Sequence, residues 1–169
     1  MARNMIIKYE DLIKYLKYEP DTGNFIWVRR PSYRGPVSVG SIAGSLNSTN
    51  NSIRIGLFGI DYLAHRLAWF YMTKEWPKLE IDHIDGNPSN NKWSNLREAT
   101  RKQNSINTVM KSNSTLNYKG ISRHNLGFRA RIRTPQGKRI WGKTRHTQAE
   151  AAEDYKVMAE TYYGEFTQT

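Results

Sequence analysis

The chain has 169 residues, 38% of them hydrophobic, and a formal net charge of +11 at pH 7. That content favours two modest hydrophobic cores over one large core, and the absence of cysteine excludes disulfides and thiolate-bound zinc. The 26 Lys and Arg residues outnumber the 15 Asp and Glu residues, which favours a polyanionic partner. No apolar run has the length of a membrane span, and residues 1–4 lack the apolar core of a secretory signal, so we expect an intracellular protein without a membrane partner.

The N-terminal part of the chain has the pattern of two helices and a small sheet. Apolar side chains recur at helical spacing from Tyr9 to Tyr18, and the turn residues Pro20–Gly23 end the helix that they predict. A second stretch of helical spacing runs from Ala64 to Met72 and closes at Trp76-Pro77. Between the two helices, short antiparallel strands are predicted over residues 24–29, 37–43 and 52–58.

A strand, a loop and a helix are predicted next. Residues Glu80–Ile84 have a strand pattern, and Asp85–Pro88 is a strong turn signal. Ser94 can cap a helix that runs to about Asn107. The residues that follow are rich in Asn, Ser and Thr and have little apolar periodicity, which predicts a linker over 108–117.

The pattern changes after the predicted linker. Thr147 and Glu150 form a capping box that starts a helix to about Tyr163, with Gly164 as its end. Strands are predicted before this helix, over residues 118–123, 127–134 and 138–143. The predicted fold class is therefore α+β, with one domain over 1–107 and a second over 118–169, in which a three-stranded antiparallel sheet packs on one helix.

Four polar residues suggest chemistry on a phosphodiester, which needs an activated water and an electrophile for the charge that builds on oxygen. His83 can accept a proton near neutral pH, and Asp82 and Asn104 offer the oxygen donors that Mg²⁺ or Mn²⁺ prefers. Nine helical residues turn through about 900°, so Asn95 and Asn104 should have different roles. Taken singly, each residue is better explained as a turn residue or a helix cap, and only the combination favours a site.

Eleven residues separate the pair Asp82-His83 from Asn95-Leu96-Arg97, and eight separate Asn95 from Asn104. This pattern is similar to the HNH endonucleases with the ββα-metal fold, in particular to phage homing nucleases with Asn at the last motif position. The resemblance covers roughly residues 9–107, with the ββα-metal core at about 79–107. It implies that His83 is the general base, that Asp82 and Asn104 bind one divalent cation, and that Asn95 tethers the loop and orients His83.

From Lys119 to Arg145 the sequence has nine basic residues and no acidic residue. Strand alternation places the basic side chains on one face, and the apolar stripe of the last helix should cover the other face. The free face suits contacts to phosphates and to guanine in the major groove, although it could also be a solvated basic surface. Its expected members are Arg129, Arg131, Arg133, Arg139, Trp141 and Lys143.

The same region resembles the plant ethylene-response-factor DNA-binding domain, which is also found appended to HNH nucleases. The resemblance implies that Arg131, Arg133, Arg139 and Trp141 lie on the DNA-reading strands. Ser122 stands where that family commonly has an arginine, so base specificity does not carry over. The matching residues are Tyr118–Ile121, Phe128–Arg133, Arg139–Trp141 and Ala151-Ala152 with Tyr155.

The sequence as a whole predicts a metal-dependent endonuclease that cleaves double-stranded DNA at a recognised site, in the manner of a phage or mobile-element homing nuclease. We expect it to act in the cytoplasm or nucleoid of a bacterial host, as a monomer or a homodimer. The alternative is a DNA-binding regulator that keeps an inactive nuclease module as a scaffold. Further DNA contacts are expected at Arg97, Arg101 and Arg123.

Overall fold

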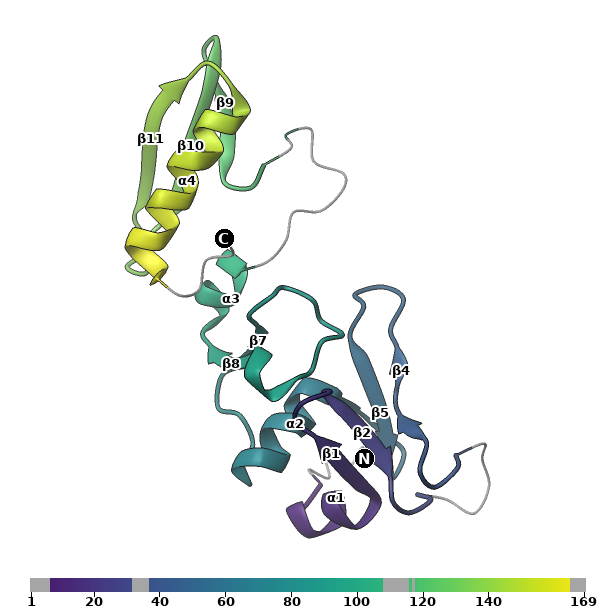
Figure 1. The fold of residues 1–169 in the computed structure, drawn as a ribbon. Coiled ribbons are helices and arrows are strands. Elements are labelled where there is room, and N and C mark those ends of the chain that lie inside the picture. Colours follow the sequence, from purple (N-terminus) through teal and green to yellow (C-terminus); the bar gives the residue numbers. More distant parts are fainter. Residues whose placement is uncertain (1–6, 32–36, 108–115, 117, 165–169) are drawn as a thin grey trace. The chain divides into compact units, whose positions relative to one another are not determined.

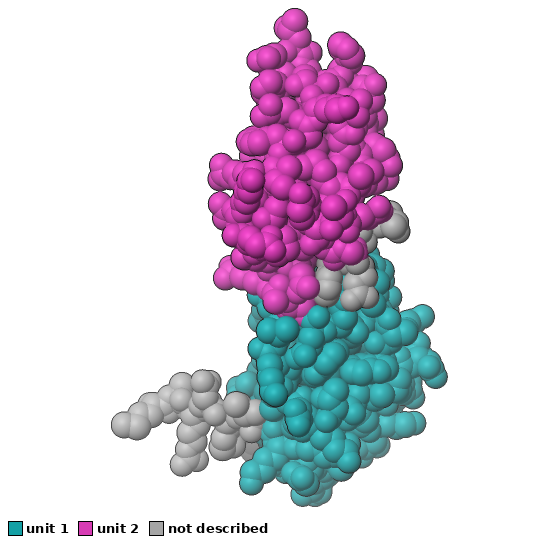
Figure 2. Space-filling view, turned by 90° about the vertical axis from the view of Figure 1, so that its left-hand side faces the viewer, with its two compact units in different colours: residues 1–98 teal, residues 99–169 magenta. Residues whose placement is uncertain are grey.

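A computed structural model describes residues 7–31, 37–107, 116 and 118–164 of the chain (Figure 1). They form four α-helices and several small antiparallel sheets, and none of the helices in these ranges combines the length and apolar character of a membrane span. The chain divides into two compact units, Met1–Glu98 and Ala99–Thr169 (Figure 2). The sequence predicts the division later, after residue 107, and the predicted linker over 108–117 lies outside the described residues except for Leu116.

The first helix is shorter than the sequence predicts. Helix α1 spans Tyr9–Tyr15, and the residues expected to extend it to Tyr18 form the strand β1 (Leu16–Glu19) instead. Leu16 adopts extended backbone angles, φ −130° and ψ 136°, and pairs with Trp27 of the next strand. The side chains of Leu16 and Tyr18 are buried on the same face of β1, a spacing of two that the helical pattern had hidden.

Two three-stranded sheets precede β7 in the first unit. One has the order β1-β2-β3, with β2 at Asn24–Trp27 and β3 at Ile42–Ala43. The strand predicted over 37–43 is reduced to its last two residues because residues 38–41 form a turn, in which Ser41 N donates to Ser38 O at 3.1 Å. The other sheet has the order β4-β5-β6, with bounds Ser45–Leu46, Ile53–Leu57 and Ile60–Leu63.

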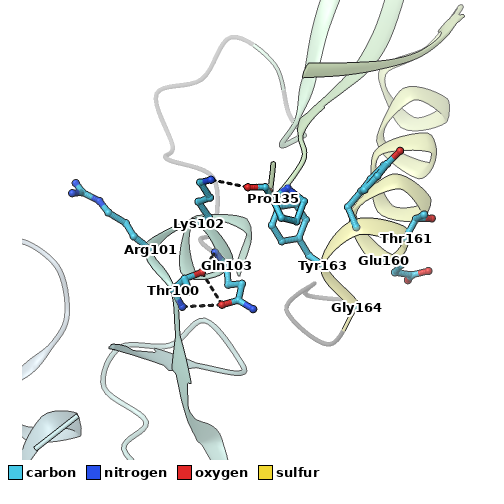
Figure 3. Close-up of a pocket in the computed structure, with 10 residues that line it drawn as sticks. Thr100, Arg101, Lys102, Gln103, Pro135, Glu160, Thr161, Tyr163 and Gly164 are labelled. Carbon is cyan, nitrogen blue, oxygen red and sulfur yellow. Dashed lines mark hydrogen bonds between the residues drawn. The ribbon is translucent and has the colours of Figure 1, made fainter. Parts of the chain in front are cut away.

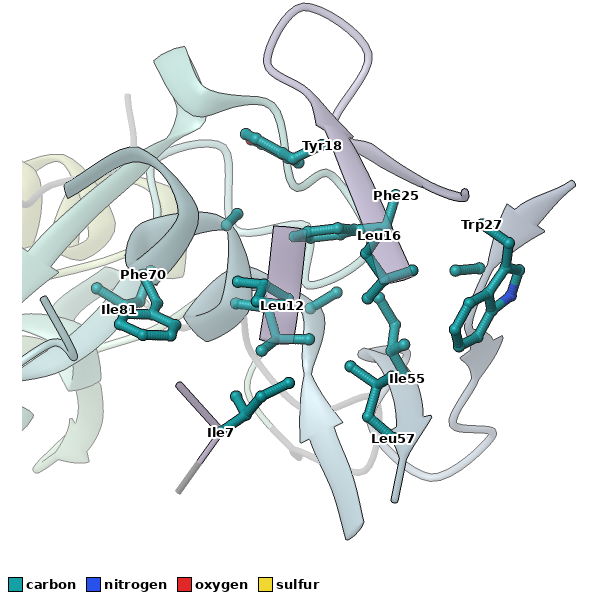
Figure 4. Close-up of a cluster of buried hydrophobic side chains, with 14 of the residues drawn as sticks. Ile7, Leu12, Leu16, Tyr18, Phe25, Trp27, Ile55, Leu57, Phe70 and Ile81 are labelled. Atoms are coloured by element: carbon teal, nitrogen blue, oxygen red, sulfur yellow. The ribbon is translucent and has the colours of Figure 1, made fainter. Parts of the chain in front are cut away.

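A single hydrophobic core lies between these sheets, α1 and the helix α2 (Ala64–Thr73), and Figure 4 shows its side chains. Burial of such side chains is what stabilises the unit, since truncating one of them to Ala typically costs about 2–5 kcal/mol. Ile81 and Leu96 belong to the same cluster, so the segment that carries Asp82 and His83 is anchored to this core. The largest fully buried side chains are Phe25, Leu12, Leu16, Ile55, Leu57 and Leu67.

The helix predicted over 94–107 is broken into three elements. After β7 (Glu80–His83), residues Trp93–Asn95 form a single 3₁₀ turn, Leu96–Ala99 form β8, and only Arg101–Asn107 form the helix α3. β8 pairs with β7 in a two-stranded sheet and buries Leu96 and Ala99. Thr100 caps the N-terminus of this helix: its backbone N donates to Gln103 Oε1 at 2.8 Å while Gln103 N donates to Thr100 Oγ1 at 3.3 Å, a reciprocal capping box.

The second unit contains the predicted three strands and their helix. Strands β9 (Ile121–His124), β10 (Gly127–Arg133) and β11 (Arg139–Arg145) form an antiparallel sheet in the order β11-β10-β9. Helix α4 (Gln148–Tyr163) packs on one face of this sheet (Figure 1). Its capping box of Thr147 and Glu150 and its end at Gly164 are confirmed.

Helix α3 is built into the core of the second unit. Ile106 packs against Ile132, Ala159 and Tyr163. Lys119 donates from Nζ to the carbonyl oxygens of Ser105 and Ile106, at 2.8 and 2.5 Å, and so places a positive charge at the C-terminal end of the helix dipole. The helix that the sequence assigned to the nuclease module therefore depends on the C-terminal sheet and α4 for its packing.

Candidate active site

Asp82 and His83 lie at the end of β7 and are both buried, with 3% and 7% of their surface exposed. Their side chains have different partners, as expected for neighbours on a strand. Asp82 is bound by Arg97, and His83 contacts Asn91 and His65. The two chemically active groups are thus adjacent in sequence but are held from separate sides.

Arg97, from β8, binds the Asp82 carboxylate. Its Nε and Nη2 atoms lie 2.9 and 2.8 Å from the same oxygen, Oδ2. The Arg97 side chain is only 14% exposed, so this is a largely buried ion pair. We expected Arg97 to contact DNA, but in the structure its guanidinium compensates the charge of Asp82.

The imidazole of His83 is held by two side chains. Its Nε2 lies 3.1 Å from Oδ1 of Asn91 in a buried hydrogen bond, and its ring meets the ring of His65 edge to face, with centroids 5.0 Å apart and an interplanar angle of 87°. Neither Asn91 nor His65 is among the four polar residues that the sequence pattern singles out. Nothing in the sequence distinguishes Asn91 from the neighbouring Asn90, and only the fold shows which of them faces the histidine.

His65 comes from the first turn of α2 and remains neutral. Burial, together with the nearby His83 and Arg66, lowers its pKa from 6.5 to about 3. Its Nδ1 atom is buried and has no hydrogen-bond partner within the described part of the chain. A neutral ring beside His83 avoids a like charge next to that residue when it takes up a proton.

Asn95 closes the loop between β7 and the 3₁₀ turn. Its Oδ1 accepts from Asp85 N at 3.0 Å, and its Nδ2 donates to Asp85 Oδ1 at 2.9 Å and to Asn90 O at 2.8 Å. Burial acts to raise the pKa of Asp85, but hydrogen bonds from Asn90, the Asn87 backbone and Asn95 outweigh it and lower the pKa. Asn95 thus ties the loop, whereas the side chain seen to contact His83 is that of Asn91.

Asn104, the second metal ligand implied by the sequence pattern, lies on α3 and so belongs to the second unit, while Asp82 belongs to the first. The carboxylate and amide oxygens of the two residues fit a hard cation such as Mg²⁺. Arg97 contacts Oδ2 of Asp82. The described residues contain no group of three or more His, Cys, Asp or Glu side chains that could hold a metal ion.

The free face of the C-terminal sheet carries the expected arginines around Trp141. The guanidinium carbon of Arg129 lies 4.5 Å from the centre of the Trp141 ring, a cation–π contact, and Arg131 pairs directly with Trp141 across the strands. Arg133 pairs with Arg139 in the same ladder. This basic face consists of Arg129, Arg131, Arg133, Arg139 and Trp141. Lys143 was also expected here, but it lies in the β11 bulge beside Thr144, which takes the place opposite Arg129, and its charge acts on Asp154 of α4.

Two basic residues of the sheet are directed away from the basic face. Arg123 pairs with Phe128, so its side chain projects from the face on which α4 packs. In β11 an extra residue separates the pairings Arg131↔Trp141 and Arg129↔Thr144, and this bulge places Arg145 on the helix side. There Arg145 binds Asp154 of α4 through two hydrogen bonds of 2.7 and 2.8 Å.

Arg101 lies on a separate cleft within the second unit. Figure 3 shows this cleft, of about 860 Å³, between the first turn of α3, Pro135 and the C-terminal end of α4. Lys102 closes one side of it by donating to Pro135 O at 2.7 Å. Arg101 is exposed, as a phosphate contact would require, whereas Arg97 is not.

The segment that contains β7 and most of α3 is similar to known proteins. A family model described as HNH endonuclease matches residues 62–106. The chain is also similar to an uncharacterized HNH endonuclease of Acanthamoeba polyphaga mimivirus, with 41% identity over 88 residues, which is 52% of this chain and 45% of the relative. The chain therefore spans less than half the length of that relative, and no solved structure matches it significantly. The matched segment holds Asp82, His83, Asn95 and Asn104 and is similar to HNH endonucleases.

Proposed function

We propose that this protein is a metal-dependent DNA endonuclease that hydrolyses phosphodiester bonds at a recognised site. The observation that carries the proposal is the end of β7, where a buried carboxylate and a buried imidazole are adjacent and each is fixed by its own partner. Both residues lie inside the segment that matches the HNH endonuclease family. Asn104, on α3, is the second oxygen donor that the resemblance to HNH endonucleases implies.

In the proposed reaction His83 takes a proton from a water molecule as the water attacks phosphorus, and the bond to the 3′-oxygen breaks. A divalent cation held by Asp82 and Asn104 would stabilise the negative charge on the phosphoryl and leaving oxygens. Asn95 keeps the loop after His83 closed, so that the backbone beside the base does not move. His65 stays neutral 5.0 Å from His83 and therefore does not oppose its protonation.

The basic face of the second unit is proposed to bind double-stranded DNA. Its arginines provide charge and bidentate donors, and Trp141 offers a flat ring against which Arg129 is already stacked. A sheet whose other face is covered by a helix leaves this face available to a groove of the duplex. In this proposal the basic face recognises the DNA site, and the nuclease unit cleaves without choosing the sequence.

The test is cleavage of plasmid and phage DNA by the whole chain with Mg²⁺ or Mn²⁺ and with EDTA. His83→Ala should reduce the cleavage rate by about 10²- to 10⁴-fold while DNA affinity stays within about twofold. His146→Ala removes an exposed histidine of the other unit and serves as the control. Undiminished cleavage by the His83 variant would refute the assignment of the general base.

The Arg97–Asp82 pair favours a second candidate, a DNA-binding regulator with an inactive nuclease module. An arginine on a metal ligand neutralises the charge that would attract the cation. DNA binding without cleavage in Mg²⁺ or Mn²⁺, by the whole chain and by Arg97→Gln alike, would support the regulator. Cleavage that EDTA abolishes would support the enzyme.

The proposed biological setting is that of a homing nuclease of a phage or mobile element, acting on DNA inside a bacterial host. One chain holds one Asp82-His83 pair, so a monomer would nick one strand and a homodimer would cut both. Mapping the cleavage ends on host genomic DNA tests both points, because a homing nuclease leaves ends at one or a few sites, whereas a non-specific nuclease leaves them throughout.

A further inference from the structure

Asn91 is buried, with 3% of its surface exposed, and its side-chain amide has a fixed orientation. Nδ2 donates to Ser89 O at 3.4 Å, which turns Oδ1 toward His83, where it lies 3.1 Å from Nε2. An amide oxygen can only accept a hydrogen bond. The neutral His83 ring must therefore carry its proton on Nε2, and the lone pair resides on Nδ1.

The backbone of Asn91 is held in turn by the N-terminal hairpin. The hydroxyl of Tyr18, on β1, donates to Asn91 O at 2.6 Å in a buried hydrogen bond. Two residues on, Trp93 N donates to Pro20 O at 2.9 Å. The loop that faces the histidine is thus pinned at two points by β1 and the turn that follows it.

Gly23 lets the hairpin approach this closely. It has φ +76°, and a Cβ at this position would lie 2.4 Å from both the carbonyl carbon of Asn91 and the nitrogen of Lys92. No side chain fits at that distance, so the β1–β2 turn packs directly onto the backbone of Asn91. The β1–β2 turn therefore contacts Asn91, and Asn91 contacts His83.

We infer that Asn91 is a positioning residue for His83, that it selects the tautomer whose Nδ1 accepts the proton, and that the β1–β2 hairpin holds Asn91 in place. The catalytic meaning of this arrangement rests on the proposed function. The arrangement itself does not, because the tautomer is a property of the protein without metal or DNA. His65 packs against the ring edge to face, while Asn91 supplies a buried acceptor at Nε2.

The direct test is NMR of the whole chain with ¹⁵N-labelled histidine, without metal and at a pH where His83 is neutral. The wild type should show His83 with the proton on Nε2 and a cross-peak for that N–H. Asn91→Ala should lose the cross-peak, because the proton then exchanges with water, whereas Asn91→Asp keeps an acceptor and should keep the peak. Asn87→Ala, an exposed residue of the same loop, is the control and should match the wild type. A proton on Nδ1 in the wild type, or an unchanged Asn91→Ala spectrum, would overturn the inference.

Cleavage kinetics then connect the tautomer to catalysis. Asn91→Ala should lower kcat by about 10²-fold, the size expected for a displaced catalytic group, with KM for DNA nearly unchanged. Gly23→Ala should lower kcat in the same way without touching the histidine, and circular dichroism establishes that each variant is folded. If His83→Ala cleaves normally, the proposed function fails while the NMR result stands. If His83→Ala is inactive and Asn91→Ala keeps the wild-type kcat, the inference fails alone.

Discussion

Arg97 directs both Nε and Nη2 to a single oxygen of Asp82, Oδ2, at 2.9 and 2.8 Å. With 3% of the Asp82 side chain and 14% of the Arg97 side chain exposed, the pair is removed from most solvent screening. The pair therefore sets a positive charge against a buried carboxyl group that is proposed to bind the cation. Without a bound cation, Arg97 is the positive charge beside Asp82, and a bound cation would be a second one.

Replacing Arg97 with Met should destabilise the metal-free protein. An uncompensated buried carboxylate typically costs about 3–5 kcal/mol in the free energy of unfolding, measured here by urea titration at pH 7. Adding Asp82→Asn should recover part of the loss, since the charge is then gone. Arg54→Met, on an exposed position of β5, is the matched control and should change little. Strictly additive effects of the Arg97 and Asp82 variants would contradict the pairing.

The same Arg97 variant bears on the metal site. Because Asp82 is released from its arginine, Mn²⁺ should raise the melting temperature of Arg97→Met by more than it raises that of the wild type. The comparison is made by thermal denaturation with and without Mn²⁺. Equal shifts in the two proteins, or none in either, would mean that Asp82 does not bind the cation.

Asn95→Ala should open the loop that follows His83. The change removes three partly buried hydrogen bonds, each worth about 0.5–1.5 kcal/mol in the free energy of unfolding. The amide of Asp85 should then exchange faster with D₂O. Asn87→Ala removes bonds from an exposed side chain of the same loop and should cost about 1 kcal/mol at most. Equal losses in the two variants would argue against a special role of Asn95.

The spacing of apolar residues and the capping residues were enough to predict two of the helices. The helix at Ala64–Thr73 and the helix begun by the Thr147 capping box lie close to their predicted bounds. The spacing failed to predict the structure of residues 94–107. Leu96 and Ala99 are three residues apart, which fits one face of a helix, but both are buried on β8, the strand that pairs with β7. The Thr100-Gln103 capping box was the local signal that marks the true helix start.

The candidate site was predictable as residue types in order, but its contacts were not. Spacing suggested Asp82, His83, Asn95 and Asn104, whereas the partners Asn91, His65 and Arg97 follow from tertiary packing. On the basic sheet, alternation gave the right face for the arginines of β10. It gave no warning of the β11 bulge, which turns Arg145 to the helix side.

The low pKa of His65 predicts that the free energy of unfolding depends on pH. Its pKa of about 3 in the folded protein lies below 6.5, so between these values the unfolded chain binds a proton that the folded protein does not. The free energy of unfolding therefore loses nothing to His65 above pH 6.5. It falls as the pH drops toward 3, by up to about 1.4 kcal/mol per pH unit. In urea titrations at pH 7, 6 and 5, His65→Phe should show a shallower loss than the wild type. His146→Gln should follow the wild type, and a His65→Phe profile that did so as well would show that burial of this imidazole does not set the slope.

The arginine face and the opposite face of the same sheet differ in their expected effect on DNA binding. If Arg131, Arg133 and Arg139 each neutralise one phosphate, changing any of them to Gln should reduce the slope of log affinity against log salt by about 0.9. Arg123→Gln removes the same charge from the sheet but from the side that α4 covers, so its slope should stay at the wild-type value. Fluorescence anisotropy with duplex DNA over a range of salt concentrations measures both. The two kinds of variant have the same net charge, so a general effect of lost charge would lower all the slopes equally. Equal slopes would therefore exclude this face as the one that binds DNA.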